Sequence, residues 1–531
     1  MVLLKGFFLI FKNLNMKILT LIFIVLYFPV FSQKPVVEWA KTFGGSKTEF
    51  PYSIAVTKDN KYVIAGFTSS SDGDVTNLRG SSDAWLIKLN ENGSIIWKKN
   101  YGGSGVQVFG SITQTLDEGY IIVGGTTSTN GDVTENKGGG DIWIVKIDSI
   151  GTIQWQKTIG GSKTEYAGSV FQTKNGDYIV GAYSSSSDFD FPQNSGERDW
   201  WVLKLNNQGT IIWKKRIGGS KSDTLLEIVN IDDKTFAITG TTDSEDGDMV
   251  GSKGDFSVKL DSSGNILWKK SFGSPLGIPI GLKELHTITV SKNEIVQAGM
   301  MIISQPRTNP SALPYSWDYW VTKLDTAGNL KWSKIFGGTD TDDATSIKAF
   351  PNGDLLVAGY TQSNDTIIKD NHGGLDFWVI RIDSSGNLKN ADCYGGSENE
   401  QVYCSAIDKK GNVIVVGHSL STNGTFTQNK GSYDWAILKL RYPGTSVKEP
   451  LLNEKAIVEF PNPLQDQFIV RISQNIAPNL TISNVLGKRM YQSKQLKSET
   501  TIDTSSFPNG MYILTYQFEG ETFSRKIMKM Q

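Results

Sequence analysis

The chain has few of the residues that usually build metal sites or nucleophilic catalytic centres. Its 531 residues include 2 cysteines and 3 histidines. The histidines, His286, His372 and His418, fall in three different copies of the repeat described below, so they predict neither a zinc site nor a Ser/His/Asp triad. Acidic and basic residues balance to a net charge of −1, which provides no basic field for nucleic acid. We therefore expect neither an enzyme nor a nucleic-acid-binding protein.

The two cysteines, Cys393 and Cys404, leave two alternatives open. They lie on either side of the last Gly-Gly turn described below. They could form a disulfide between neighbouring strands if the chain is exported. Two unpaired thiols in a hydrophobic core are the other alternative. Metal binding by this pair would need ligands from elsewhere in the chain.

Glycine, by contrast, is abundant, with 55 residues, and much of it lies in a recurring Gly-Gly doublet. The doublet usually follows a segment that contains Trp, and it is reduced to a single Gly in the fifth copy. The first glycines of the seven copies are Gly44, Gly102, Gly160, Gly218, Gly273, Gly337 and Gly395. Successive copies are 58, 58, 58, 55, 64 and 58 residues apart. Such a period indicates one supersecondary unit repeated seven times.

Each repeat predicts four antiparallel strands. In the first copy the expected strands are 52–57, 62–68, 84–89 and 94–99. The turn between the third and fourth strands is Asp or Asn, two further residues, and Gly; the first side chain caps the turn and Gly takes the positive-φ position. Because no helical period is present, this pattern predicts an all-β, seven-bladed β-propeller of four-stranded antiparallel blades.

The ends of the repeat region favour a closed ring over an open array of β-units. The seventh copy has its third strand at 435–440 but no fourth strand with Trp. Residues 36–43 form such a strand and have no blade of their own. We expect residues 36–43 to complete the blade formed by 402–440, since this N-terminal strand closure leaves no sheet edge exposed.

Tryptophan and charged residues recur at fixed places in the repeat. A recurring Trp could stack on a sugar, but blades bury both faces of their sheets, so we expect the 14 tryptophans to pack in the core. An Asp at the start of the third strand precedes a Lys or Arg by five residues, as in Asp83 and Lys88. This odd spacing puts the two on opposite faces of the strand, so they are not partners, whereas pairing with an adjacent blade is open.

The loop between the second and third strands is the longest and most variable part of the repeat, and it shares a rim with the Gly-Gly crossover. Any binding surface is expected there. Closely spaced carboxylates in these loops suit calcium, although Asp-Gly-Asp is also an ordinary turn and no copy contains a complete calcium loop. The candidate calcium ligands are Asp72, Asp74, Asp132, Asp188, Asp190, Asp246 and Asp248. Apolar, Pro-rich insertions at 274–280 and 305–310 form a candidate partner surface on the same rim, with drift of one repeat as the simpler account.

The N-terminus predicts a signal peptide over residues 1–32. Met16 and Lys17 precede an apolar stretch that ends near a cleavage site before Gln33, and Met16 itself could be the start. A transmembrane anchor is the alternative, but Lys5 and Lys12 interrupt the apolar stretch. We therefore expect an exported chain with no transmembrane segment after cleavage.

The repeat pattern of GGS, G-Y-I-V-x-G, T-S-x-x-D-G-D-V and D-x-W-x-V-K-L-D-x-x-G resembles secreted bacterial β-propeller repeat proteins. Residues 119–155 follow this pattern closely. The resemblance implies a secreted propeller over 33–440 and carries no assigned activity or site residues.

The C-terminal tail resembles the type A sorting domain of type IX secretion. The residues that carry this resemblance include Pro461, Asn462, Pro463, Gly487, Asn509, Gly510 and Tyr512. It implies a small domain over 455–531, after a linker at 441–454, that the type IX machinery handles. The cargo is then released or attached to the outer cell surface. Alternating apolar and polar strands with Pro-Asn-Gly turns independently predict a small β-sandwich.

These features favour a secreted or cell-surface binding or adhesion module with a glycan or protein ligand. A structural envelope component without a small ligand and a polysaccharide-degrading enzyme remain as alternatives. No cofactor is expected apart from calcium at the rim. Propellers serve all three roles, so the fold alone does not choose among them.

Overall fold

The computed structural model contains two compact units that divide at about residue 443. The described residues are 34–250, 254–271, 283–304, 315–365, 367–442, 458–459, 467–472, 479–484, 487–493, 499–518 and 521–529. The predicted signal peptide, the two Pro-rich insertions and residues 461–463 lie outside these ranges. Among the described residues, no helix is both long enough and apolar enough to span a membrane.

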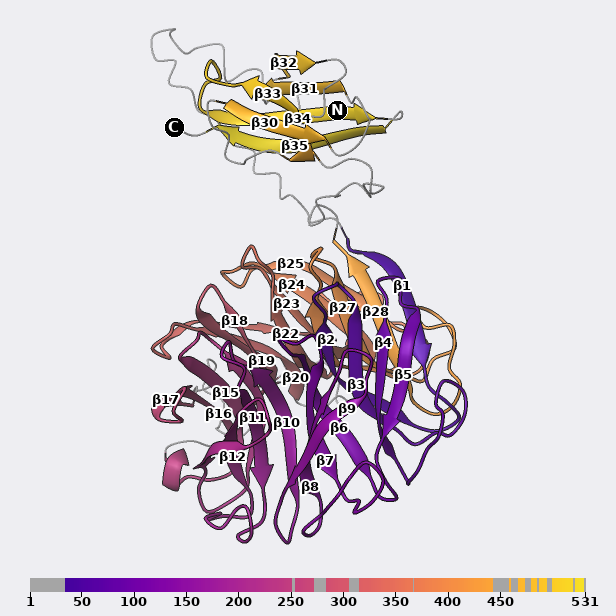
Figure 1. The fold of residues 1–531 in the computed structure, drawn as a ribbon, viewed down its shortest axis with the longest axis vertical. Helices are drawn as coiled ribbons and strands as arrows, with labels where there is room; N and C mark the ends of the chain where they lie inside the picture. Colours follow the sequence, from indigo (N-terminus) through magenta and orange to yellow (C-terminus); the bar gives the residue numbers. More distant parts are fainter. Residues whose placement is uncertain are drawn as a thin grey trace. The chain divides into compact units, whose positions relative to one another are not determined.

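The first unit is a seven-bladed β-propeller, and each blade is a four-stranded antiparallel sheet (Figure 1). Blades 1 and 2 contain β2 (Glu49–Val56), β3 (Tyr62–Thr68), β4 (Asp83–Leu89) and β5 (Ile95–Tyr101), then β6 (Gln107–Gln114), β7 (Tyr120–Thr126), β8 (Asp141–Ile147) and β9 (Ile153–Ile159). Blades 3 and 4 contain β10 (Glu165–Gln172), β11 (Tyr178–Ser184), β12 (Asp199–Leu205) and β13 (Ile211–Ile217), then β14 (Asp223–Asn230), β15 (Thr235–Thr242), the 3-10 turn η2 (Gly247–Met249), β16 (Gly254–Asp261) and β17 (Ile266–Lys270).

The remaining blades follow the same order. Blades 5 and 6 contain β18 (Lys283–Ser291), β19 (Glu294–Ser304), β20 (Tyr315–Leu324) and β21 (Leu330–Phe336), then β22 (Asp342–Ala349), β23 (Leu355–Thr361), β24 (Asp376–Ile382) and β25 (Leu388–Tyr394). Blade 7 contains β26 (Glu400–Ile407), β27 (Val413–Ser419), β28 (Asp434–Arg441) and, from the other end of the repeat region, β1 (Val36–Phe43).

The ring closes as the sequence predicts. β1 pairs antiparallel with β28, with Phe43 opposite Trp435 and Val36 opposite Arg441. The first strand of each blade contacts the first strands of both neighbouring blades around the whole ring. Closure therefore leaves the seventh sheet with four strands, like the other six.

The propeller extends slightly beyond its predicted C-terminal boundary. Arg441 ends β28, and Tyr442 is 1% exposed and packs against Phe350 with ring centroids 6.0 Å apart. The predicted linker therefore starts two residues too early, because this aromatic contact lies after the last β-patterned residue.

Tryptophan packs the blades together in two ways, which confirms the core interpretation. In the third strands, Trp85 is fully buried and lies 4.4 Å, centroid to centroid, from Trp435 of the previous blade. In the outer strands, half-buried Trp39 covers the β4–β5 turn of the next blade and donates its indole N–H to the Glu91 carbonyl at 3.0 Å. A Cβ on Gly93, whose φ is +73°, would lie 3.0 Å from the Trp39 ring. The outer-strand Trp and the hairpin Gly therefore recur together.

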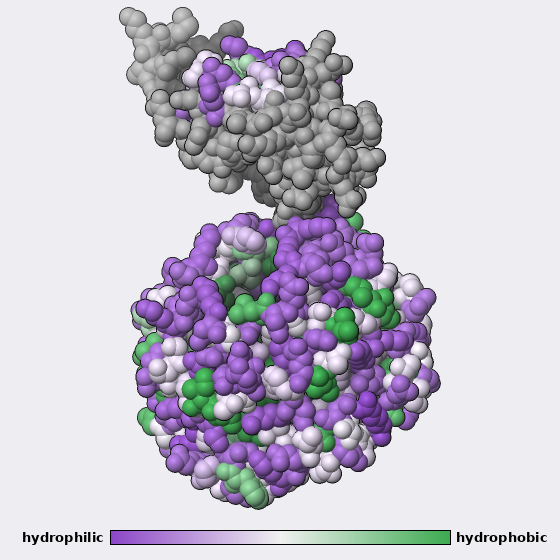
Figure 2. All heavy atoms as spheres, viewed as in Figure 1, coloured by the Kyte–Doolittle hydropathy of each residue, from purple (hydrophilic) through white to green (hydrophobic). Residues whose placement is uncertain are grey.

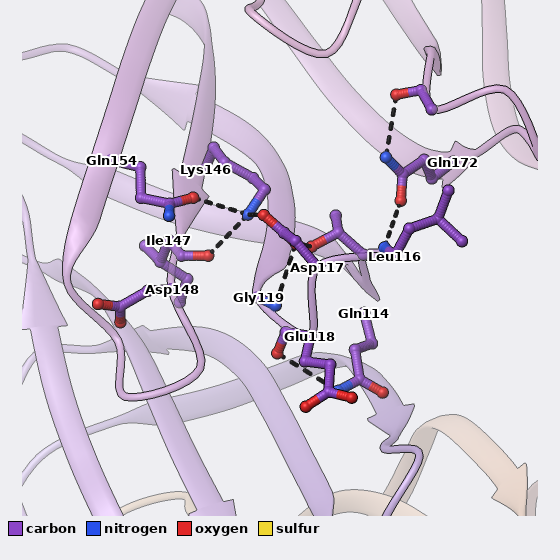
Figure 3. A network of polar contacts seen from close by, with 12 residues as sticks. Gln114, Leu116, Asp117, Glu118, Gly119, Lys146, Ile147, Asp148, Gln154 and Gln172 are labelled. Carbon is purple, nitrogen blue, oxygen red and sulfur yellow. Dashed lines mark hydrogen bonds and ion pairs between the residues drawn. The ribbon is translucent and has the colours of Figure 1, made fainter.

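The third-strand cation also stabilises the blades, as Figure 3 shows for blade 2. The Lys146 ammonium contacts the Asp117 carboxylate at 2.9 Å, the Gln154 side chain at 2.8 Å and the Ile147 carbonyl at 3.1 Å. In other blades the equivalent lysine donates to a hairpin carbonyl of the next blade, and these pairs are Lys88–Ser149, Lys259–Thr326, Lys323–Ser384 and Lys439–Glu91. The cation therefore bonds groups beyond its own strand as well, and it reaches an adjacent blade in these four cases.

The two cysteines are free thiols. Cys393, on β25, packs with Phe336 and Trp378, whereas Cys404, on β26, packs with a separate cluster that includes Ile414. Burial raises the pKa of both thiols, that of Cys404 to about 12. The unpaired alternative is thus the one observed, because the two side chains pack in different core clusters.

The second unit contains two small antiparallel sheets. One has the order β29-β30-β33 and the other β32-β31-β34-β35. Their bounds are β29 (Val458–Glu459), β30 (Gln467–Ile472), β31 (Asn479–Asn484), β32 (Arg489–Ser493), β33 (Glu499–Asp503), β34 (Gly510–Phe518) and β35 (Glu521–Lys529). Ile502 of the first sheet and Leu480, Ile482 and Leu514 of the second are fully buried. This agrees with the predicted small β-sandwich.

The described sorting residues shape turns and a strand start. Gly487 follows β31 with a φ of +81°, and its N–H bonds to the Asn484 carbonyl at 3.0 Å. The Tyr512 hydroxyl donates to the Pro508 carbonyl at 2.6 Å, and its ring lies 5.1 Å from Phe507. The spacing of the Phe-Pro-Asn-Gly-Met-Tyr segment therefore has a structural cause.

Candidate functional site

The first set of predicted rim carboxylates binds backbone amides of the Gly-Gly crossover. Asp72 accepts the Ser46 N–H at 2.7 Å, and this bond lowers the pKa of its carboxyl group. Asp188 and Asp246 accept the equivalent amides of Ser162 and Ser220 at 2.8 and 2.7 Å. In blades 2 and 7 an asparagine side chain accepts the equivalent amide N–H. Asn130 accepts the Ser104 N–H at 2.8 Å, for example. A neutral amide fills this position equally well.

The second set joins neighbouring blades at the same rim. Asp190 accepts the Gly160 N–H at 3.0 Å and pairs with Lys137 of the preceding blade at 2.6 Å. Asp132 binds the Gly102 N–H and Arg79 in the same manner, and Asp74 binds the Gly44 N–H and Lys430. Asp248 accepts the Gly218 N–H at 3.4 Å. These contacts are partly exposed, so each contributes modestly to stability.

These contacts give the seven predicted calcium ligands a structural role that needs no metal ion. Among the described residues, no three His, Cys, Asp or Glu side chains form a group that could hold a metal ion. Calcium binding at this rim stays a prediction.

Pairs of buried acids lie beneath the crossover. Glu49 accepts the Gly45 N–H at 2.9 Å, and a Cβ on Gly44 would lie 2.5 Å from Glu49 Oε2 and 2.3 Å from Asp434 Oδ1 of the previous blade. The equivalent interblade pairs are Asp141–Glu165, Asp199–Asp223, Asp318–Asp342 and Asp376–Glu400. The glycine is therefore required at this crossover.

Burial raises the pKa of several of these acids. It raises the pKa of Asp141, Asp318 and Asp434 to about 6, and that of Asp342 to about 7. Paired carboxylates of this kind are typical of glycosidases. These pairs lie at most 6% exposed, so substrate cannot reach them. They are better explained as interblade packing groups.

The first strand of each blade, called the inner strand here, differs most from blade to blade. Each inner strand contains a bulge, where the strand register shifts by one residue. The residue at this shift is Tyr52, Gly110, Gly168, Leu226, His286, Thr345 or Tyr403, from blade 1 to blade 7. The bulged residue thus ranges from no side chain to a full phenol ring. The seven blades therefore surround an asymmetric channel.

An aromatic cavity of about 420 Å³ opens on the side of the channel formed by blades 1 to 4. Gly110 and Gly168 create its space, since the same position carries Tyr in blades 1 and 7. Half-buried Tyr52, Tyr166 and Tyr183 line it, and the rings of the last two lie 6.0 Å apart. Its volume falls in the range of roughly 300–1,000 Å³ typical of ligand sites.

The tyrosine hydroxyls of the cavity are hydrogen-bond donors. A Cβ on Gly110 would lie 2.4 Å from the Tyr166 hydroxyl, which therefore projects over this glycine. Burial raises the pKa of Tyr52 and Tyr166 above the ordinary value of tyrosine. Both phenols consequently remain protonated at neutral pH. Val108, Thr224, Leu225 and Leu226 complete the lining.

Aromatic side chains of blade 7 pack against those of blade 1. Tyr403 lies 5.3 Å from Tyr52 between ring centroids, and His418 lies 5.0 Å from Phe50. Burial lowers the pKa of His418 to about 4, so its imidazole is neutral. His286 contacts Asp343 at 3.1 Å, and His372 contacts Asp376 at 2.7 Å. The three histidines lie in three different blades and have different partners.

The repeat pattern of the sequence does not predict the channel residues, because they are the residues that differ from copy to copy. Aligning the copies at their glycines puts Tyr52, Gly110, Gly168 and Tyr403 at one position, directly after a position that stays apolar. This variation was the available signal. The cavity itself depends on the bulge, which no local pattern predicts.

On the face seen in Figure 2, hydrophilic residues predominate and hydrophobic ones form small separate patches.

Comparison with known proteins identifies the C-terminal unit. Residues 459–530 match the family described as "Secretion system C-terminal sorting domain". The chain is 26% identical over 226 residues to the Regulatory protein FlaEY of Caulobacter vibrioides. That match covers 41% of this chain and 23% of the relative, so the chain spans less than a quarter of the relative's length.

The propeller resembles solved structures at low identity. The Pan2 WD40 domain of Neurospora crassa has a TM-score of 0.45 at 11% identity, with 78% of this chain and 97% of that chain covered. The α-L-arabinanase of Penicillium chrysogenum complexed with arabinobiose has a TM-score of 0.39 at 7% identity, with 76% and 98% covered. Neither likeness assigns a function. The protein is a seven-bladed β-propeller followed by a type IX C-terminal sorting domain, which marks it for export.

Proposed function

We propose that the protein is an exported binding module whose central channel holds a saccharide. The observation that carries this proposal is the cavity of about 420 Å³ lined by Tyr52, Tyr166 and Tyr183. A sugar ring has C–H faces that pack on aromatic rings and hydroxyls that accept hydrogen bonds from phenols. Amphipathic tyrosines supply both contacts at once.

The channel is a better candidate than the rim. The predicted rim carboxylates already accept backbone amides, and three of them also meet a cation of the neighbouring blade. Their oxygens are therefore engaged in holding loops together. The cavity tyrosines, by contrast, are half-buried, with part of each side chain open to a ligand. The sorting domain would place such a module outside the cell, released or attached to its surface, in adhesion or nutrient capture.

A glycan array tests this function, with the protein compared to its Gly168→Tyr variant. A Cβ on Gly168 meets its nearest atom at 3.6 Å, and Tyr already occupies this position in blades 1 and 7. The variant should therefore fold and fill the cavity. Ile150→Ala, at a residue 64% exposed on a hairpin, is the matched control.

We expect selective glycan binding that Gly168→Tyr abolishes and Ile150→Ala preserves. Binding unaffected by Gly168→Tyr would move the site away from the channel. No binding to any glycan would contradict the proposal. Repeating the array with chelator tests the predicted calcium dependence, and breakdown of the bound glycan would favour the polysaccharide-degrading alternative.

A further inference from the structure

A guanidinium lies at the edge of the aromatic cavity. Arg198 immediately precedes β12, and its Cζ lies 4.3 Å from the centroid of the Tyr183 ring, so the two groups stack. Its Nη1 donates to the Thr224 hydroxyl at 3.3 Å. Tyr183 and Thr224 both line the cavity. Arg198 is therefore tied to two walls of the proposed saccharide site.

Arg198 forms no ion pair with the described residues, unlike other arginines of the propeller. Arg216 meets Asp199 at 3.0 Å and Arg381 meets Asp354 at 2.6 Å, whereas no carboxylate lies within 4.0 Å of Arg198 among the described residues. Its Nε is buried and makes no hydrogen bond. A buried N–H group without an acceptor is costly, so the protein leaves this guanidinium incompletely satisfied. Arg198 as a whole is half-buried, so an anionic ligand group would meet its terminal N–H groups.

The charge is specific to blade 3. The residue directly before the recurring third-strand Asp is Ser82, Gly140, Arg198, Gly254, Trp317, Leu375 and Tyr433 in blades 1 to 7. Structural cations of this propeller recur in several blades, as the third-strand lysines do. A cation that is found once at this position, beside the aromatic cavity, does not follow the repeat and points to a ligand.

We propose that Arg198 makes this cavity selective for acidic saccharides, with the carboxylate of a uronic acid as the group that it binds. Stacking on Tyr183 fixes the plane of the guanidinium, so a carboxylate would approach along its terminal N–H groups, where a planar pair of donors favours bidentate binding. The sugar ring then packs against Tyr166 and Tyr183. This inference rests on the proposed saccharide-binding function and names the class of saccharide.

The test compares oligogalacturonate with its methyl ester by titration calorimetry of the full chain. The two probes differ at the carboxyl group, which is charged in the acid and neutral and methylated in the ester. We expect the acid to bind about tenfold or more tightly than the ester, as for a charge-assisted hydrogen bond in a partly buried site. The preference should weaken as salt is added.

Variants locate this preference. Arg198→Gln should remove it, and Arg198→Lys, which keeps the charge but loses the planar fork, should retain part of it. Lys174→Gln removes one positive charge from an exposed hairpin and should leave the preference intact. Equal binding of acid and ester by the unchanged protein overturns the inference whatever the variants do.

The outcomes separate this inference from the proposed function. Binding of neutral glycans that Gly168→Tyr abolishes, without any preference for the acid, would leave the saccharide site standing and refute the role of Arg198. A failure to bind any glycan, acidic or neutral, would refute both.

Discussion

The third and first strands of each blade differ in how much they vary around the ring. The third strand keeps its Asp, its aromatic residue and its cation, as in DAWLIKL of β4, DIWIVKI of β8 and DFWVIRI of β24. The bulged residue of the first strand changes from Tyr52 to Gly110 and Gly168 within three blades. Side chains of the third strand pack against the neighbouring blades, where they meet equivalent residues in every copy. The first strand faces the channel, and variation of its bulged residue makes the lining of the channel differ from blade to blade.

Removing the closing strand should have the largest effect on stability. Deletion of residues 34–43 exposes the edge of β28 and removes Trp39 from the next blade's hairpin. We expect the melting temperature, followed by circular dichroism, to fall by more than about 10 °C. Val37→Thr, at a residue 43% exposed on the same strand, is the control. An unchanged melting temperature of the deletion variant would contradict ring closure by β1.

Truncating one aromatic residue in each strand type compares the strands directly. Trp143→Ala, at a fully buried position of β8, should lower the free energy of unfolding by about 3–5 kcal/mol. Tyr166→Ala, at a half-buried position of β10, should cost about 1 kcal/mol but abolish glycan binding. Urea unfolding and a binding assay on both variants provide the measurements. A stability loss of the same size in both would show that the channel residues are core residues after all.

The buried acid pairs should make stability depend on pH in an unusual direction. Asp141, Asp318 and Asp434 have folded pKa values of about 6 and Asp342 of about 7, against 3.8 for the unfolded chain. Between pH 4 and 7 the folded state therefore binds more protons than the unfolded state. The free energy of unfolding should consequently decrease as pH rises through this window.

Urea unfolding at several pH values checks this dependence. Asp342→Asn should flatten the decrease, because one of the groups responsible no longer titrates. Asp72→Asn should not change it, because hydrogen bonds hold the pKa of Asp72 below its ordinary value, outside the window. A free energy of unfolding that rises steadily from pH 5 to 8 would contradict the raised pKa values.

The smallest effect is expected at the rim. Asp72→Asn should change the free energy of unfolding by about 0.5 kcal/mol or less, since Asn130 and Asn423 accept the equivalent amide in their own blades. Thermal unfolding with calcium and with chelator measures this. A calcium-dependent rise in melting temperature that Asp72→Asn abolishes would establish the predicted metal site and show that the carboxylate has a second role.

Repeated residues allowed much of the fold to be predicted from the sequence. The Gly-Gly period gave the blades, and the unpaired segments at 36–43 and 435–440 gave the closure. The rim carboxylates were harder, because Asp72 has the same sequence context whether it binds a cation or the Ser46 amide. The proposed role of Arg198 could not be predicted from the sequence, because it depends on contacts with Tyr183 and Thr224 that form only in the folded chain.

The most direct test of the saccharide-binding channel is a crystal structure of the protein with the tightest glycan from the array. The account predicts a sugar ring within about 4 Å of Tyr166 and Tyr183, in the space left by Gly110 and Gly168. A ligand bound at the rim loops around Asp72 and Asp188, with the channel empty, would contradict it.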